Sequence, residues 1–574
     1  MNISIDHTRS LTLADIVAVG TGKAKAVLSA ATREMLAERR AQIEHAITEQ
    51  EFPAYGFNRG FGHNVDLAVK SEHLADLQEN LILSHAVGAG EPMDETVVRI
   101  TMLLRANSLA RGFSGIRPEL VEAILDLLNA GITPVVPELG SVGASGDLAP
   151  LSHIAMVVIG RGKVFYEGEM IPTEVAMTRA GLKPIKLMMK EGLALTNGVQ
   201  FMNAIGLYVC HRLKVMLKTA AINSALTAQV MLAPDTYYRA DFHAVRPHPG
   251  STRVADWIWR LMQDSPIRNA HRDFKTDGQV QDPYNIRCAA QVLGSAHDLI
   301  DQAEKSLVIE ANSATDNPIL LPDEDGNHID VVSGGHFHGM PVAVHVYSLM
   351  QALGVMASLA HQRSVRFVDP TKNKGLGRDL KWPGLSKDEN SISSGMMMLE
   401  YASASLLNSI WGDSMPSHLF NISTNSGQED HVSMGTGLAV RLLKTLPKAN
   451  HILAIELAFI LQGIAIRKHL DTIPTEAELP SWVDEELGNL KHRMNGQGKG
   501  VFFDACVLRE HPLTDEEKKF SPACEHLFDV LTDRKLFPVV EHDRYMAEDV
   551  AHLADFVACG GVLEIVGEKL DLDW

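Results

Sequence analysis

Helical spacing dominates the pattern of apolar and polar positions along the chain. Val121, Ile124, Leu125 and Leu128 follow one another so that all four lie on one face of a helix. Gly131 comes next, where a helix commonly ends in a left-handed residue. The spacing therefore predicts a helix over 121–128 that ends before this glycine.

Three longer stretches, residues 213–232, 345–360 and 451–466, are weakly charged and rich in Ala, Leu and Met. These residue types favour helix interiors, and too few charged positions remain to form an exposed face. We therefore expect a mainly α, elongated protein whose helices are buried against one another and against neighbouring subunits.

Residues 339–362 contain no Asp, Glu, Lys or Arg and are numerous enough to span a bilayer. The same stretch carries His345, Gln351 and His361, which a helix facing lipid would hold at a cost in free energy. Since no second comparable segment accompanies it, we expect a helix packed inside a large bundle and no membrane span.

Strands are expected to be short and local. The pattern GKVFYEGEMI at 162–171 predicts a small hairpin. Residues 369–390, rich in Lys, Gly, Pro and Asp, indicate a mobile loop, and residues 495–538 resemble an insertion between helices.

The chain contains no internal repeat and no linker rich in Pro, Gly or Ser. We predict a core over residues 1–475, with a chemically active loop at 140–150. A C-terminal helical region over 476–574 follows, and it includes the insertion.

The composition limits the possible partners. Of 574 residues, 45% are hydrophobic and 21% charged, as in a globular protein with a large core. Lys and Arg number 52 against 71 Asp and Glu, which gives a formal net charge of −19. Because an acidic surface repels phosphate backbones and anionic lipid, we expect neither nucleic acid nor membrane as a partner.

The cysteines and the N-terminal residues indicate the compartment. The five cysteines are too sparse for a disulfide framework and form no CxxC pair: Cys210, Cys288, Cys506, Cys524 and Cys559. The first thirty residues hold several acids and no continuous apolar block, unlike a signal peptide. Both observations predict a cytoplasmic location.

Residues 140–147 read GSVGASGD and place three glycines within eight positions. The segment lacks the lysine of a phosphate-binding P-loop, the spacing of a GxGxxG fingerprint and the final glycine of a GxSxG nucleophile elbow. A tight turn before a helix is the simplest interpretation.

The tripeptide Ala144-Ser145-Gly146 has a chemical interpretation as well. In a tight turn the Gly146 nitrogen can approach the Ala144 carbonyl carbon and close a five-membered ring, because glycine adopts conformations closed to other residues. Loss of water from Ser145 then leaves an exocyclic methylidene, an electrophile that no ordinary side chain offers.

The segment GSVGASGDLAPLSHIA at 140–155 resembles the signature of the aromatic amino acid ammonia-lyases, which build a methylidene-imidazolone (MIO) group from Ala-Ser-Gly. Further blocks resemble the family in the same order along nearly the whole chain: AYGFNRGFG at 54–62, NSLARGFSGIR at 107–117, LTNG at 195–198, QDPYNIRC at 281–288, SATDNP at 313–318, SGGHFHG at 333–339, QEDHVSM at 428–434 and DRYMAEDV at 543–550. The chain is therefore identified as a member of this family, most similar to the histidine type.

The resemblance implies a mainly α fold, with an elongated central helical bundle of the ammonia-lyase and fumarase-like type and a smaller mixed N-terminal region. It implies a homotetramer in which each active site draws residues from several subunits. MIO formed from Ala144, Ser145 and Gly146 is the expected cofactor, with no metal or nucleotide.

The resemblance also implies roles for single residues. Tyr55 matches the base that removes the β-proton of the substrate. Asn197 and Tyr284 match the residues that bind the MIO and orient it. Arg287 matches the guanidinium that clamps the substrate carboxylate, and Gln281 would support that clamp. Phe337 resembles the aromatic residue that lines the MIO pocket.

The ring pocket resembles that of the histidine type. Leu83-Ser84-His85 is similar to the Ser-His of those members, Glu429 lies in a similar block, and Met397 aligns with a methionine that lines the imidazole pocket. An imidazole presents one donor and one acceptor nitrogen, which His85 and Glu429 can satisfy together. A phenyl ring would leave the carboxylate buried and unpaired, so L-histidine is the expected substrate and urocanate and ammonia the products.

Several blocks depart from the histidine type. Residues 408–411 read NSIW where a Glu-Asn-Lys run is usual, residues 423–427 read STNSG, and His63 adds a histidine near the site. These departures keep open a lyase acting on ergothioneine with release of trimethylamine, or on another aromatic amino acid. An inactive helical scaffold of lyase ancestry is the remaining alternative. The intact Ala144-Ser145-Gly146, Tyr55 and Arg287 argue against it.

A metal site is also considered. His336 and His338 would lie on one face of a strand, a spacing that zinc can use. No third ligand is identifiable from the sequence, so we expect these histidines to be structural.

Overall fold

The computed structural model describes residues 1–50, 57, 73–270, 281–322, 329–470 and 514–574. This part of the chain forms two compact units. Unit 1 comprises Met1–His211, Gln302–Leu349 and Met415–Leu443, and unit 2 comprises Arg212–Asp301, Met350–Ser414 and Lys444–Trp574.

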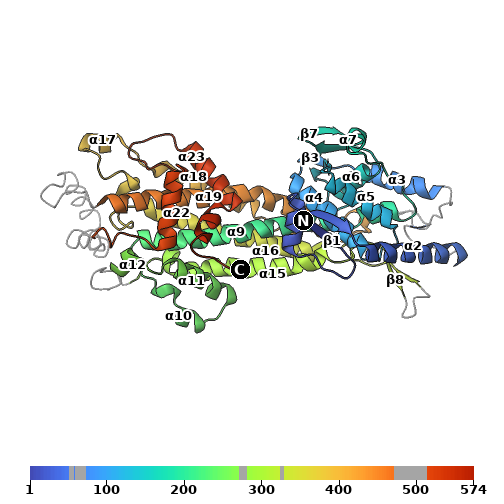
Figure 1. Cartoon of the computed structure of the whole chain (residues 1–574), viewed down its shortest axis with the longest axis horizontal. Coiled ribbons are helices and arrows are strands. Elements are labelled where there is room, and N and C mark those ends of the chain that lie inside the picture. Colours follow the sequence, from blue (N-terminus) through green and yellow to red (C-terminus); the bar gives the residue numbers. More distant parts are fainter. Residues whose placement is uncertain (51–56, 58–72, 271–280, 323–328, 471–513) are drawn as a thin grey trace. The chain divides into compact units, whose positions relative to one another are not determined.

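Helices make up most of unit 1 (Figure 1). The helices that lie wholly within it are α1 (Leu13–Gly20), α2 (Ala30–Gln50), α3 (Leu74–His85), α4 (Glu95–Ala110), α5 (Pro118–Asn129), α6 (Leu148–Val158), α7 (Thr173–Ala180) and α8 (Glu191–Thr196), with the 3₁₀ turns η5 (Ser417–Leu419) and η6 (Asn425–Gly427).

Short strands form four small sheets in the described part of unit 1. They are β1 (Asn2–Ile5) parallel to β2 (Lys25–Leu28), β3 (Ala89–Pro92) antiparallel to β5 (Pro137–Leu139), the antiparallel set β4 (Thr133–Pro134), β6 (Lys163–Tyr166) and β7 (Glu169–Pro172), and β8 (Ile319–Pro322) antiparallel to β9 (Ile329–Val332). In the β6–β7 hairpin Lys163 pairs with Pro172 and Tyr166 with Glu169. The predicted hairpin over 162–171 is confirmed.

Helix α5 forms as its sequence dictates. Pro118 stands in the first turn, where its missing N–H has no intrahelical acceptor. The four apolar residues at helical spacing are all buried, which turns that face of the helix to the core. The chain then leaves the helix through Gly131, whose φ is 77°. Both the predicted helix and its predicted end are confirmed.

The helices that lie wholly within unit 2 are α10 (Ala240–Ala244), α11 (Pro249–Leu261), α12 (Pro266–Ala270), α14 (Tyr284–Arg287), α17 (Lys387–Ile392), α18 (Met397–Asp413), α22 (Pro522–Asp533), α23 (Ala547–Cys559) and α24 (Gly561–Gly567), with the 3₁₀ turns η3 (Thr236–Tyr238) and η4 (Arg378–Leu380). Four long helices contribute residues to both units: α9 (Gln200–Val230), α15 (Ala289–Ala311), α16 (Met340–Val368) and α19 (Gly435–His469). They contain the predicted helices at 345–360 and 451–466 in full and that at 213–232 up to Val230. The mainly α fold is confirmed.

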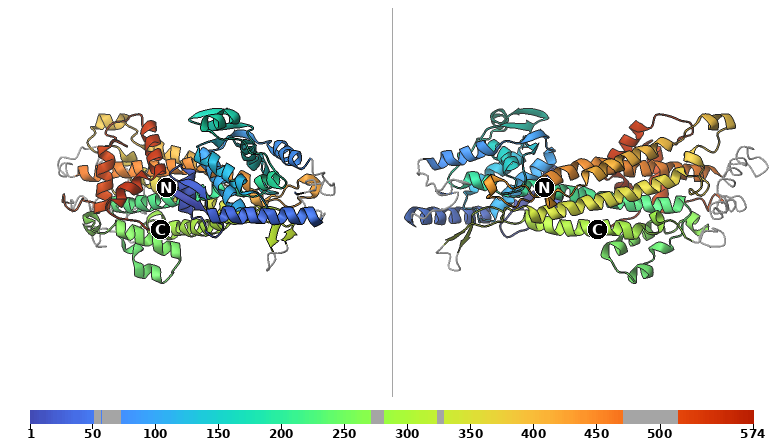
Figure 2. Two further views of the ribbon diagram at one scale, coloured as in Figure 1. Left: turned by 45° about the vertical axis from the view of Figure 1, so that its right-hand side comes forward. Right: turned by 180° about the vertical axis from the view of Figure 1, so that it is seen from behind.

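Three of the long helices are joined inside unit 2 by a buried polar cluster, where they run side by side (Figures 1 and 2). Arg363 of α16 and Glu456 of α19 form an ion pair whose side chains are both fully buried. Asn223 of α9 donates from Nδ2 to Glu456 Oε2 at 3.1 Å. The carboxylate therefore binds partners from two other helices at once.

Two helices of the described residues, α16 and α19, are long and apolar enough to cross a membrane by length and composition alone. Helices α23 and α24 pass the same test only as a pair bent by 63°. The prediction that no second segment accompanies 339–362 is therefore wrong, because α19 contains an apolar window comparable to that of α16. In this structure 94% of the apolar window of α19 and 56% of that of α16 are buried within the protein.

The two predicted irregular segments contain some regular structure. Residues 369–390 consist mostly of turns and irregular backbone, as in a loop, but they also include η4 and the start of α17. Of the predicted insertion at 495–538, the described part contains α22. The boundary at residue 475 lies outside the described residues and stays a prediction.

Candidate functional site

The loop that contains Ala144-Ser145-Gly146 docks against the start of α9 in unit 1. Gly146 forms a parallel bridge with Gly198, and the Asp147 N–H donates to Gly198 O at 2.7 Å. At Gly146 φ is 74°, and a Cβ atom there would lie 2.1 Å from Gly198 O. Only glycine fits this place in both conformation and space.

Asp147 anchors the loop from within. Its carboxylate is fully buried and accepts from Ser141 Oγ at 2.8 Å, Thr436 Oγ1 at 2.6 Å and the Met202 N–H at 2.9 Å. Burial raises the pKa of Asp147, although these three donors oppose the shift. Sequence reasoning missed this residue; its place directly after Gly146, before the apolar run of α6, was the available signal.

The structure brings three predicted site residues together in unit 1. Ser145 Oγ donates to Glu429 Oε1 at 2.8 Å, and Asn197 Nδ2 donates to Ser145 O at 3.1 Å. The other carboxylate oxygen, Glu429 Oε2, accepts from Thr424 Oγ1 at 2.6 Å. The serine is thus bound at its hydroxyl by a carboxylate and at its carbonyl by an amide.

A buried guanidinium holds Asn197 in place. Arg105 of α4 is 1% exposed and donates from Nη1 to Asn197 O and to Gln200 Oε1, both at 2.8 Å. Gln200 Nε2 in turn donates to Thr315 Oγ1 at 2.6 Å. Burial lowers the pKa of Arg105 to about 10, so the group stays protonated at neutral pH. Sequence reasoning missed Arg105, which lies two residues before the start of the NSLARG block.

A second buried cation lies in the same part of unit 1. Lys190 Nζ donates to Asp316 Oδ2 at 2.7 Å, and both side chains are fully buried. Burial lowers the pKa of Lys190, while the Asp316 carboxylate opposes this shift and Arg105 adds to it. Asp316 is therefore bound to one buried cation, Lys190, and interacts electrostatically with the other, Arg105.

Two further predicted residues lie in unit 1. His85 ends α3, is half-buried, and its Nδ1 lies 2.8 Å from Leu81 O. Phe337 is half-buried in a turn directly before α16. The predicted strand around His336 and His338 is wrong: helix formation from Met340 makes the preceding residues a turn, in which His338 Nε2 lies 3.0 Å from His431 O.

A second group of predicted residues gathers in unit 2. Arg287 donates from Nη2 to Gln281 Oε1 at 2.9 Å and from Nε to Asp282 O at 2.7 Å. Its guanidinium carbon lies 4.6 Å from the ring centroid of Tyr284, which is 70% exposed. Met397, the first residue of α18, is half-buried in the same unit. Tyr55 lies outside the described residues.

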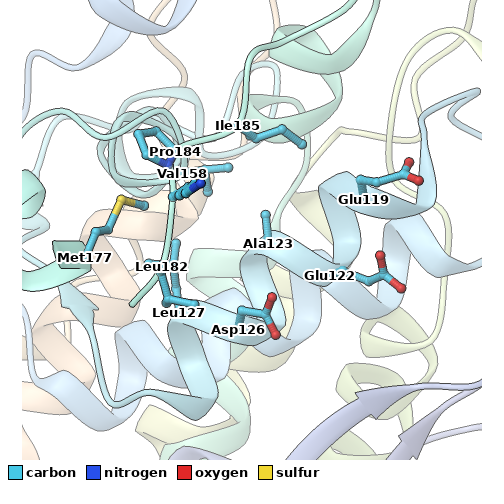
Figure 3. A pocket seen from close by; sticks show the side chains of 11 residues that line it. Glu119, Glu122, Ala123, Asp126, Leu127, Val158, Met177, Leu182, Pro184 and Ile185 are labelled. Atoms are coloured by element: carbon cyan, nitrogen blue, oxygen red, sulfur yellow. The ribbon is translucent and has the colours of Figure 1, made fainter. Parts of the chain in front are cut away.

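A cavity of about 280 Å³ lies elsewhere in unit 1, between α5 and the chain that leads out of α7 (Figure 3). Glu119, Glu122 and Asp126 lie on one side of it, and apolar side chains such as Pro184 and Ile185 on the other. Arg33 binds both glutamates, at 3.3 and 2.9 Å. None of the described site residues lines this cavity.

No group of three or more His, Cys, Asp or Glu side chains among the described residues is arranged to hold a metal ion. The described cysteines, Cys210, Cys288, Cys524 and Cys559, are free thiols.

The chain is similar in sequence to known proteins of one family. A family model described as "Aromatic amino acid lyase" matches residues 11–484. A histidine ammonia-lyase of Natranaerobius thermophilus is 42% identical over 77% of this chain and 84% of its own. A histidine ammonia-lyase of Gloeobacter violaceus is 40% identical over 80% and 87%.

Solved structures of lyases and aminomutases also resemble this chain. The histidine ammonia-lyase from Trypanosoma cruzi is 29% identical, with a TM-score of 0.81 over 100% of this chain and 96% of its own. A tyrosine aminomutase from Streptomyces globisporus is 27% identical, with a TM-score of 0.83 over 100% of both chains.

Proposed function

Because this chain belongs to the aromatic amino acid lyase family, we propose that it is a carbon–nitrogen lyase that eliminates ammonia from L-histidine to give urocanate. The observation that carries the proposal is the position of Glu429, whose carboxylate lies 2.8 Å from the Ser145 hydroxyl. A carboxylate at the reactive serine suits a substrate with a ring N–H and disfavours a phenyl ring. The histidine ammonia-lyases among the relatives support the same substrate.

The Ala144-Ser145-Gly146 segment fits the MIO group. Gly146 occupies a position that admits no side chain, and Asn197 already donates to the Ser145 carbonyl. Once formed, the group supplies the electrophile that takes up the substrate amine. Asn197, held by Arg105, keeps a hydrogen-bond donor on the oxygen where negative charge develops.

Recognition of the imidazole falls to Glu429 and His85. Thr424 fixes one carboxylate oxygen of Glu429 at 2.6 Å and leaves the other to face the reactive serine. His85 has its Nδ1 bound to the Leu81 carbonyl, so we assign its Nε2 to the substrate ring. Met397 and Phe337 complete the pocket, as the family resemblance implies.

The carboxylate of the substrate is assigned to Arg287. Its Nε is held by the Asp282 carbonyl and one Nη by Gln281, so the guanidinium is oriented before substrate arrives. Tyr284 lies against the same guanidinium. We assign to it, on the family resemblance, the orientation of the electrophile. We assign removal of the β-proton to Tyr55 on the family resemblance.

We further propose a cytoplasmic homotetramer whose active sites combine residues from different chains, with no nucleic acid or membrane partner. Helix α18 supports an assembly, since it exposes the large apolar side chains of Met398, Tyr401 and Trp411. A second copy of the chain is the partner that would cover them.

The test is an absorbance assay for urocanate formation from L-histidine by the purified protein. Steady turnover is the expected result. Turnover of ergothioneine or another aromatic amino acid without turnover of histidine would keep the lyase chemistry and overturn the assigned substrate. Inactivity with every candidate would favour a scaffold of lyase ancestry.

A further inference from the structure

We propose that Glu429 also carries the proton in the elimination of water from Ser145, the step that matures the chain, with Asn197 stabilising the charge on the Ser145 carbonyl oxygen. This inference rests on the proposed function only in taking Ala144-Ser145-Gly146 as the segment that is converted. It gives Glu429 a role before any substrate is present.

The geometry supplies both groups that such an elimination requires. The leaving oxygen, Ser145 Oγ, lies 2.8 Å from Glu429 Oε1. The carbonyl next to the acidic Cα–H, Ser145 O, accepts from Asn197 Nδ2 at 3.1 Å. Oγ and the Cα hydrogen are carried by neighbouring carbon atoms, Cβ and Cα, of the same residue, so one carboxylate oxygen can serve both in turn.

The Glu429 carboxylate alone can carry the proton through the whole elimination. Glu429 takes the proton from Ser145 Cα, and the electron pair moves into the adjacent carbonyl, where the Asn197 amide stabilises the negative oxygen. The pair then returns to form the Cα–Cβ double bond as the Cβ–Oγ bond breaks. The leaving oxygen takes the proton back from Glu429, so one water departs and the carboxylate is regenerated.

The segment that carries Glu429 is fixed to the loop on both sides of Ser145. Ser433 Oγ donates to Gly143 O at 3.1 Å, and the Met434 N–H donates to Val142 O at 2.8 Å. Thr436 binds the Asp147 carboxylate at 2.6 Å. A proton carrier must be held this closely, because catalytic geometry tolerates little displacement.

Thr424 orients the carboxylate within that segment. Besides the bond from its hydroxyl, its N–H donates to Glu429 O at 3.0 Å, and the Glu429 N–H returns a bond to Thr424 O at 3.3 Å. The pair forms an isolated antiparallel bridge. Thr424 is therefore a positioning residue for Glu429.

The experiment is Glu429→Gln, purified as the full chain and measured by mass spectrometry of the peptide that contains residues 140–155. Glutamine keeps the shape and can bind both hydroxyls, with its oxygen as an acceptor for one and its NH2 as a donor to the other. Its amide cannot take a proton from Ser145 Cα and return it to Oγ. Wild-type peptide is expected to lack two waters relative to the encoded sequence, one from ring closure and one from Ser145. The variant is expected to retain the Ser145 hydroxyl in most chains, and to lack the absorbance of the methylidene.

Two further variants make the result specific. Asp430→Asn removes a neighbouring exposed carboxylate and is expected to mature like wild type. Thr424→Val, which leaves Glu429 in place but less well oriented, is expected to mature about tenfold more slowly after expression is induced. Thr424→Val also tests the inference should Glu429→Gln fail to fold.

Complete maturation of Glu429→Gln, or of Thr424→Val at the wild-type rate, would overturn the inference. Neither result depends on turnover, so failure of the inference is separate from failure of the proposed substrate. A wild-type chain that matures but leaves histidine untouched would overturn the substrate alone.

Discussion

At the scale of single residues, the reactive segment is governed by what surrounds it more than by its own chemistry. Ser145 has an ordinary hydroxyl, yet it lies between a carboxylate and an amide that are both held by further hydrogen bonds. Arg105 donates a hydrogen bond to the Asn197 carbonyl oxygen. The buried positive charge of Arg105 favours negative charge on the Ser145 carbonyl oxygen, which Asn197 binds. Reactivity here depends on side chains that come from distant parts of the sequence.

Sequence reasoning found the residues of the family blocks but not the residues that support them. Ser145, Asn197 and Glu429 were predicted as site residues, and the structure brings them together in unit 1. Arg105 and Asp147 were missed, because a buried arginine or aspartate in an apolar run signals only that a partner exists somewhere. That partner is fixed by folding, not by spacing along the chain.

Glu310 gives the first prediction, which concerns pH. Burial raises the pKa of this α15 carboxyl from 4.5 to about 7. Between these values the native protein keeps the proton while the unfolded chain has released it, so stability falls as pH rises through this window. We expect Glu310→Gln to be more stable than wild type by up to about 3 kcal/mol at about pH 8 and no more stable at about pH 4.

Denaturant unfolding of both proteins across the window measures this difference. Glu34→Gln on α2 is the control, because its carboxylate is already exposed to water. A gain from Glu310→Gln that did not change with pH would mean that packing, and not the buried charge, sets its effect.

At the scale of elements, hydrophobic spacing predicted where helices form but not how far they run. It predicted α5 because a single apolar face sufficed to define it. On α19 the spacing predicted only residues 451–466, and it missed the first part of the helix. The helix starts at Gly435 and continues through Arg441, Lys444 and Pro447, residues that interrupt an apolar pattern. Tertiary packing carries the helix through them. The turn at 336–338 was taken for a strand for a related reason, since short segments hold too few positions to distinguish the two.

The reactive loop and the start of α9 give the second prediction. In Gly146→Ala the new Cβ would lie 2.1 Å from Gly198 O, at a φ of 74°. Since backbone cannot move aside as a side chain can, we expect loss of maturation and a large loss of stability. Gly131→Ala is the control: its φ is 77°, but nothing lies within 4 Å.

The control should therefore lose only roughly 1–2 kcal/mol in the free energy of unfolding, the cost of holding alanine in the left-handed conformation. It should mature normally. Denaturant unfolding and the mass of the peptide that contains residues 140–155 measure the two effects. Equal losses in both variants would show that backbone conformation alone, and not the close approach to Gly198, requires glycine at this position.

The ion pair between α16 and α19 gives the third prediction. Arg363 and Glu456 are both fully buried, and Glu456 also accepts from Asn223 of α9. Glu456→Gln leaves the guanidinium buried without its counter-charge, which we expect to cost about 3–5 kcal/mol in the free energy of unfolding.

The double variant Arg363→Met with Glu456→Leu removes both charges and should lose less than the single one. Denaturant unfolding of the single and double variants measures the coupling. A double variant at least as unstable as the single one would mean that the pair contributes through its specific geometry and not through charge balance.

At the scale of the whole molecule, the residues assigned to one reaction fall in two compact units. Ser145, Asn197 and Glu429 belong to unit 1, and Gln281, Tyr284 and Arg287 belong to unit 2. The apolar residues exposed on α18 form a face that the proposed homotetramer would cover. The sequence could predict both groups of residues, since each lies in its own family block, but not which chain supplies which group to a given site.

Complementation between two inactive variants tests that point and is the fourth prediction. Ser145→Ala cannot form the electrophile, and Arg287→Met cannot clamp the carboxylate, so each protein alone should lose turnover of histidine by orders of magnitude while keeping its oligomeric state. Each variant chain, however, retains the group that the other lacks. If a site takes Ser145 from one chain and Arg287 from another, chains co-expressed in equal amounts should recover about a quarter of the wild-type sites. Mixing the two proteins after each has assembled is the control, because chains that do not exchange cannot complement. Co-expressed chains, purified through a different tag on each, that remained as inactive as the separate variants would mean that one chain supplies the whole site.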